Sequence, residues 1–72
     1  MARIKTNVAN LLQRIADKEP PRTILYGGYV WQLYETDDYY CKDKGCYLFD
    51  WFDDVHTLID SLNDEVLIKV GE

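Results

Sequence analysis

The chain is poor in the residues that metal sites and nucleophilic active sites require. Its 72 residues include two cysteines and one histidine, so a tetrahedral zinc site built on Cys41, Cys46 and His56 would need a carboxylate as its fourth ligand. At helical spacing, Asp53 and Asp60 each lie one turn from His56. Such acids usually form only weak exposed pairs with a histidine. No orienting group marks a cysteine–histidine catalytic pair. We therefore expect no enzyme, no cofactor and no metal, and a histidine at the surface.

Long apolar runs and a disulfide framework are also missing. No segment approaches the roughly 20 apolar residues of a membrane span, and the N-terminus lacks the apolar core of a signal peptide. Two cysteines are too few for the disulfide frameworks of small secreted domains. We expect reduced thiols, no membrane association and a cytoplasmic location.

Positive charge is scarce after the first 22 residues. Residues 1–22 hold five basic groups against two acids, whereas residues 23–72 hold three lysines against eleven acids. An acidic surface of this kind repels nucleic acid phosphate and favours basic partners. The acids also have a simpler explanation, since they keep a small aromatic-rich domain soluble.

Apolar periodicity predicts a helix near the N-terminus. Its stripe recurs at helical spacing, and either Thr6 or Asn7 can cap it. Pro20 and Pro21 end the helix near Lys18, because the residue before a proline is pushed out of the helical region. Residues 1–6 are expected to be flexible. The predicted stripe comprises Val8, Leu11, Leu12, Ile15 and Ala16.

Two hairpins are predicted in the middle of the chain. Gly27-Gly28 forms the first turn and pairs Tyr26 with Tyr29, which puts Ile24, Tyr26, Tyr29, Trp31 and Leu33 on the core face. In the second hairpin, Gly45 suits the left-handed position of a three-residue bulged loop. That register places Cys41 and Cys46 on opposite faces of the sheet. A four-residue loop would instead pair the two cysteines directly.

A second helix is expected to begin at an Asp50 cap with Asp53 at its third position, and "EVLIKV" reads as a closing strand. The predicted fold is therefore one α+β domain spanning residues 1–72. It has an N-terminal helix, an antiparallel meander of about four strands, a second helix and a C-terminal strand. The buried stripe of the second helix is predicted to be Phe52, Val55, Leu58, Ile59 and Leu62.

Ten aromatic residues lie between positions 26 and 52, and strand alternation cannot bury all of them. Exposed tyrosines on a sheet either stabilise it by cross-strand packing, anchor a protein partner or stack bases. Base-stacking proteins add a positive groove, whereas the segments that form the sheet here are rich in acids. We therefore expect a protein partner ahead of nucleic acid, and the candidate contact residues are Tyr29, Tyr34, Tyr40, Asp53 and Asp54.

The strings "NLLQRIADKEPPRTILY", "GGYVWQLYETDDYY", "LFDWF" and "LNDEVLIKV" resemble those of short proteins of unknown function from phages and prophages of Gram-positive bacteria. The resemblance covers most of the chain and implies a phage-encoded cytoplasmic protein. It assigns no site residue, and neither the cysteine pair nor Gly27-Gly28 belongs to its pattern.

The sequence thus predicts a small non-enzymatic module that binds a host or phage protein through exposed tyrosines and an acidic surface. One alternative is a nucleic-acid-associated regulator that uses a basic N-terminal helix carrying Arg3, Lys5, Arg14 and Lys18. A second alternative is a protein that sequesters a small nucleotide.

Overall fold

The computed structural model describes residues 3–69, which form an α+β fold with one antiparallel sheet of six strands and three helices. The predicted class is confirmed, while the number and order of the strands differ from the prediction. The elements in chain order are β1 (Arg3–Asn7), α1 (Val8–Ala16), β2 (Thr23–Tyr26), β3 (Tyr29–Tyr34), β4 (Asp38–Cys41), β5 (Cys46–Tyr47), α2 (Leu48–Trp51), α3 (Val55–Asp60) and β6 (Glu65–Lys69).

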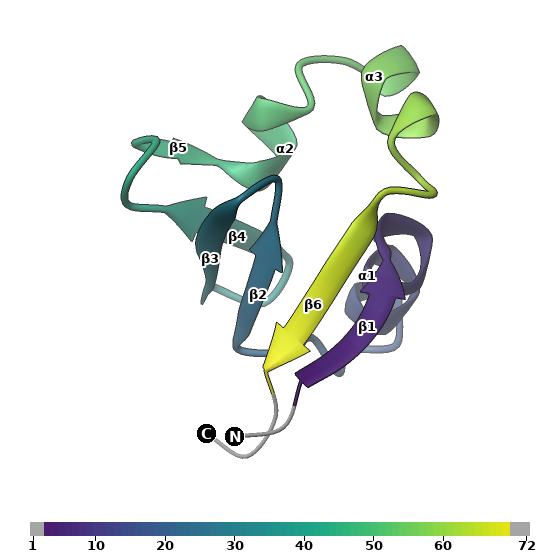
Figure 1. Cartoon of the computed structure of the whole chain (residues 1–72), viewed down its shortest axis with the longest axis vertical. Helices are drawn as coiled ribbons and strands as arrows, with labels where there is room; N and C mark the ends of the chain where they lie inside the picture. Colours follow the sequence, from purple (N-terminus) through teal and green to yellow (C-terminus); the bar gives the residue numbers. More distant parts are fainter. Residues whose placement is uncertain (1–2, 70–72) are drawn as a thin grey trace.

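Strand β6 lies inside the sheet, whose order is β1-β6-β2-β3-β4-β5 (Figure 1). Its Ile68 pairs with Ile4 of β1 on one side and with Ile24 of β2 on the other. Residues 1–6 were expected to be flexible; residues 3–6 are part of strand β1, and residues 1 and 2 lie outside the described residues. The sequence pattern could not reveal β1, because the strand that forms its backbone hydrogen bonds, β6, lies some 60 residues away along the chain.

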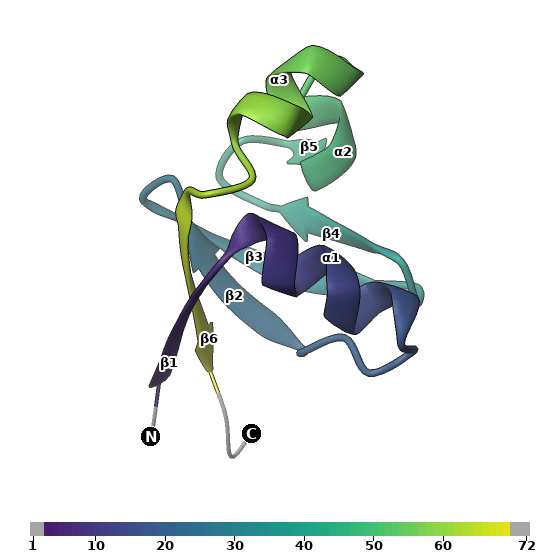
Figure 2. The same ribbon diagram turned by 90° about the vertical axis from the view of Figure 1, so that its right-hand side faces the viewer.

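Helix α1 begins and ends close to its predicted limits. Asn7 is the N-cap, and its side-chain oxygen accepts a 2.9 Å hydrogen bond from the Asn10 N–H. The N–H of Val8 donates to the carbonyl of Asp64 at 3.1 Å, which ties the start of the helix to the entry into β6. The helix lies behind β1 in Figure 1 and in front of β3 in Figure 2. Its Val8 and Leu11 are buried against the sheet.

The first hairpin has the predicted register. Tyr26 pairs with Tyr29 and Ile24 with Trp31, and Gly27 and Gly28 both take positive φ angles, 62° and 81°. The side chains of the predicted core face pack into or against the core, as expected.

The second hairpin has the other register. Cys41 pairs directly with Cys46 across a four-residue loop, so the prediction that they lie on opposite faces is wrong. Gly45 does take the left-handed conformation, with φ 68°, and its N–H donates to the Cys41 carbonyl at 2.7 Å. The glycine was placed correctly, but the turn contains one more residue than the bulged loop.

The predicted second helix is broken in two. Asp53 has a φ of 70° and separates α2 from α3, and Asp54 rather than Asp50 caps α3 by accepting a 2.8 Å hydrogen bond from the Thr57 N–H. Because the chain changes direction at Asp53, α3 does not continue the buried stripe of α2. Val55 and Ile59, predicted to be buried, are 66% and 56% exposed.

One apolar core forms between α1, α2 and one face of the sheet. Trp31 lies at its centre with no exposed surface, and its indole N–H donates to the Tyr26 carbonyl at 3.0 Å. Trp51 of α2 packs against it with ring centroids 5.9 Å apart. The buried hydrophobic residues are Val8, Leu11, Ile24, Tyr26, Trp31, Tyr39, Cys41, Leu48, Phe52, Val66 and Ile68.

Trp31→Ala is expected to lower the free energy of unfolding by about 3 to 5 kcal/mol, because it leaves a cavity and removes the partner of the Tyr26 carbonyl. A domain of this size has little stability to lose, so the variant should be largely unfolded. Urea denaturation followed by circular dichroism measures the effect. Trp51→Ala is the matched control and should lower the free energy of unfolding by less, since Trp51 is partly exposed. Equal losses in the two variants would contradict a core centred on Trp31.

Tyr39 links β4 to the segment that precedes β2. Its ring is buried, and its hydroxyl donates to the carbonyl of Pro21. Burial raises the pKa of the Tyr39 hydroxyl well above its usual value, because the ionised form would be poorly solvated. Burial, followed by the hydrogen bond to Asp64, likewise raises the pKa of Tyr26.

Stability should therefore fall at alkaline pH. Above about pH 10 the unfolded chain ionises its tyrosines while the folded protein holds Tyr39 and Tyr26 protonated, so ionisation favours the unfolded state. Tyr39→Phe should cost about 1 kcal/mol at pH 7, where the Pro21 carbonyl loses its donor, and should flatten the decline above pH 10. Urea midpoints between pH 7 and 11 test both effects. An unchanged slope in Tyr39→Phe would contradict this account.

Candidate interaction surfaces

The predicted contact residues fall on separate parts of the molecule. Tyr34 and Tyr40 point from the face of the sheet opposite α1, which we call the open face. Tyr29 belongs to the core face, and Asp53 and Asp54 lie between α2 and α3. The tyrosines and acids that the sequence grouped into one surface thus belong to different surfaces.

Tyr34 and Tyr40 are brought together by a third tyrosine that was not among the predicted contact residues. The ring of Tyr47 lies 5.2 Å from that of Tyr34 and 5.1 Å from that of Tyr40. A hydrogen bond with the Tyr34 hydroxyl, followed by partial burial, raises the pKa of Tyr47. Tyr34 and Tyr40 remain 49% and 36% exposed. The direct pairing of Tyr40 with Tyr47 across β4 and β5 could be found only with the correct hairpin register.

Gln32 extends the row of tyrosines across the sheet. Gln32 of β3 pairs with Tyr40 of β4, which places it next to the cluster on the open face. A shallow depression of about 420 Å³ is lined by Val30, Gln32, Tyr40, Lys42 and Asp43. A second depression, which includes Arg22, adjoins Gln32 from the side of β2.

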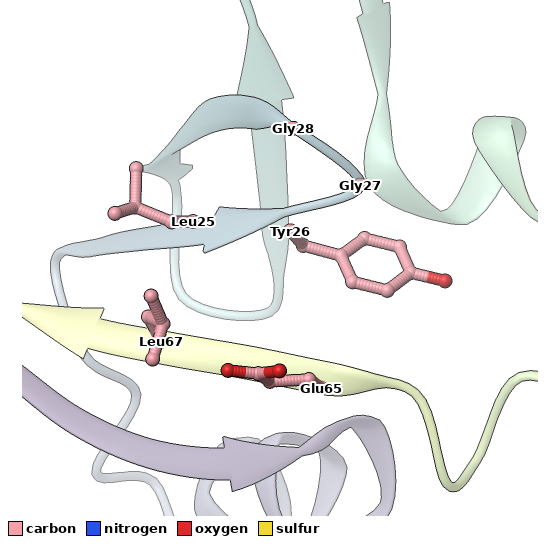
Figure 3. A pocket seen from close by; sticks show the side chains of 6 residues that line it. All are labelled: Leu25, Tyr26, Gly27, Gly28, Glu65 and Leu67. Carbon is pink, nitrogen blue, oxygen red and sulfur yellow. The ribbon is translucent and has the colours of Figure 1, made fainter.

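A further depression lies at the first hairpin turn and is shown in Figure 3. Leu25 and Leu67 lie on the neighbouring strands β2 and β6, and the ring of Tyr26 points in another direction. Its volume is about 400 Å³, and Glu65 is its one ionisable side chain apart from Tyr26. The residues that line this depression include no pair of a general base and a nucleophile, which an active site for covalent catalysis would need.

Tyr29 is half-buried and partly covered by a lysine. The ammonium group of Lys44 lies 4.8 Å from the Tyr29 ring centroid and 4.9 Å from that of Trp51, and the two rings themselves pack edge to face. Such contacts are typical of cation–π stabilisation. Tyr29 therefore supports the junction of β3 and α2 and offers little ring surface to a partner.

The α2–α3 segment, residues 48–64, is an acidic and partly apolar surface. It contains five aspartates and neither lysine nor arginine. Val55 and Ile59 are exposed on α3, while Leu58 and Leu62 of the same segment pack against the core. Hydrogen bonds from the backbone and side chain of Thr57 lower the pKa of Asp54, so this carboxylate is charged at neutral pH. Phe49 and Trp51 of α2 are also partly exposed at the same end of the molecule (Figures 1 and 2).

The residues considered for metal binding do not assemble into a ligand set. Cys41 is buried, Cys46 is half-buried, and His56 is exposed on α3. Among residues 3–69, no three histidine, cysteine or acidic side chains come together in a way that would hold a metal ion.

No family model, curated protein or solved structure matches this chain. The resemblance to phage proteins therefore remains a prediction. Within the described part of the chain, the helices are too short and too polar to cross a bilayer.

Both cysteines are free thiols in the structure, although they face each other across the hairpin. We expect two titratable thiols per chain after unfolding without reductant. In the native protein, Cys46 should react with a thiol reagent faster than the buried Cys41. Cys41→Ser and Cys46→Ser identify the reacting group in turn. Faster reaction of Cys41 would contradict the arrangement of this hairpin.

Proposed function

We propose that this protein is a small non-enzymatic interaction module that binds a basic protein segment through its α2–α3 surface. The observation that carries the proposal is the exposure of Val55 and Ile59 on a helix surrounded by aspartates. Neighbouring apolar side chains of this size are usually buried, whereas here the break at Asp53 leaves them in solvent.

The chemistry of the surface indicates the chemistry of the partner. An apolar anchor surrounded by charges of one sign suits a segment that carries a large apolar side chain among lysines or arginines. The aspartates accelerate the encounter with such a segment, and the apolar contact supplies most of the affinity. If the phage resemblance holds, the segment belongs to a host or phage protein.

Selection of binders from a displayed library of random twelve-residue peptides tests the proposal without knowledge of the partner. The selected peptides should be enriched in lysine or arginine and should contain at least one large apolar residue. Ile59→Ser should weaken their binding by at least about fivefold, because it removes the anchor. Its effect on stability should be small, since the side chain is mostly exposed.

Val30→Ser is the matched control, because Val30 is an exposed apolar residue on the open face. It should leave peptide binding unchanged. The proposal fails if the selected peptides show no basic bias, or if Val30→Ser and Ile59→Ser reduce binding equally.

A further inference from the structure

The open face differs in charge from the rest of the molecule. Its corner at β1 and β6 carries Arg3, Lys5 and Lys69, while Arg22 and Lys42 border the two depressions next to Gln32. The carboxylates on or beside this face are those of Glu65, Asp38, Asp43 and Glu35, the last of which acts electrostatically on Tyr47. Five basic groups thus accompany four acids, in a chain whose formal net charge is −5.

Two of these carboxylates make contacts within the protein, and the contact of Glu65 also engages Lys5. Glu65 lies 3.9 Å from the ammonium group of Lys5, and Asp38 accepts a 2.8 Å hydrogen bond from the Tyr39 N–H. The sequence argument against nucleic acid relied on the acids in the segments that form the sheet. In the fold, the aspartates of residues 48–64 belong to the α2–α3 segment, and Asp37 lies in the turn between β3 and β4. Glu35 lies in the same turn, but its charge acts on Tyr47 of the open face. The aspartates of residues 48–64 therefore do not count against the open face, whereas Glu35, Asp38 and Asp43 do.

We propose that the open face binds single-stranded nucleic acid. Tyr34 and Tyr40 offer exposed rings on which unpaired bases stack, and the amide of Gln32 beside Tyr40 can donate to and accept from a base edge. Arg22 and Lys42, on either side of this row, neutralise the phosphates. A duplex keeps its bases stacked within the helix, so a flat tyrosine surface favours a single strand.

A second copy of the chain fits this face less well. A symmetric dimer formed through the open face would set the same five basic groups against one another, and like charges at an interface are repulsive. The acidic α2–α3 surface, which suits a basic protein segment, lies elsewhere. The charge and the aromatic rings of the open face therefore favour a polyanion with stacking bases.

Fluorescence anisotropy of a labelled single-stranded oligodeoxythymidylate of twelve nucleotides, titrated with the intact protein, tests the proposal. Binding should weaken as salt increases. Lys42→Gln and Arg22→Gln should each reduce the slope of log K against log salt by about 0.7. Tyr40→Ala should weaken binding by about 5- to 150-fold, whereas Tyr40→Phe, which keeps the ring, should bind like the parent.

Arg14→Gln is the control for charge, because Arg14 is exposed on α1, on the other side of the sheet. It should leave the affinity and the salt slope nearly unchanged. A larger effect of Arg14→Gln than of Lys42→Gln would overturn the proposal and assign binding to the basic helix. Failure to bind at low salt, equal affinity for a blunt duplex, or a dimer in sedimentation that Tyr40→Ala dissociates would also overturn it.

The two surfaces are tested separately. Ile59→Ser should weaken selected-peptide binding and leave oligonucleotide affinity unchanged, whereas Tyr40→Ala should weaken oligonucleotide binding and leave peptide binding unchanged. Loss of oligonucleotide binding in Ile59→Ser would show that the open face is not the binding surface.

Discussion

The insertion of β6 between β1 and β2 is the constraint on which the rest of this structure depends. Ile68 lies between Ile4 and Ile24, and Val66 lies between Thr6 and Tyr26, so the last described strand joins the first strand to the central hairpin. The same segment accepts the Val8 N–H through Asp64, and the Asp64 side chain accepts a 2.9 Å hydrogen bond from the Tyr26 hydroxyl. Strand pairing, helix docking and a side-chain contact therefore meet in a few residues. Without β6, β1 would have no partner and α1 would lose the hydrogen bond that ties its first turn to the sheet.

A single left-handed residue accounts for the character of the α2–α3 surface. An unbroken helix from Asp50 would have turned Val55 and Ile59 toward the core together with Phe52. With Asp53 at positive φ, Phe52 stays buried and α3 starts again from its own Asp54 cap. A non-glycine residue in this region carries a conformational cost, which tends to persist where the surrounding contacts enforce it. Here the enforcing contacts are those of Phe52 and Trp51 with the aromatic core. The exposed apolar pair follows directly from that break.

The fold separates charges that the sequence presents as a simple gradient. Arg3 and Lys5 come from the basic N-terminal segment, and Lys42 and Lys69 come from the acidic remainder, yet all four lie on or beside the open face. The predicted basic helix is divided by the same rearrangement, since Arg3 and Lys5 belong to β1 and only Arg14 remains within α1. On the two proposals made above, a domain of net negative charge presents one face to basic peptides and another to phosphates. The proposals rest on that separation and not on net charge.

Local interactions let the sequence alone determine α1 and the first hairpin. The Asn7 cap involves residues three positions apart, and the turn at Gly27-Gly28 sets the pairing of Tyr26 with Tyr29 within four residues. In the second hairpin, the same local reasoning placed Gly45 in the left-handed region but could not choose between loops of three and four residues, which differ little in intrinsic preference. Tertiary packing decided that choice, because only the observed register puts Cys46 on the core face beside Cys41 while Tyr47 meets Tyr40 on the other face. Strand β1, the break at Asp53 and the grouping of Tyr34, Tyr40 and Tyr47 were likewise decided only by the tertiary structure. Each depends on partners distant in the chain, and neither periodicity nor turn chemistry specifies which distant segment will meet which.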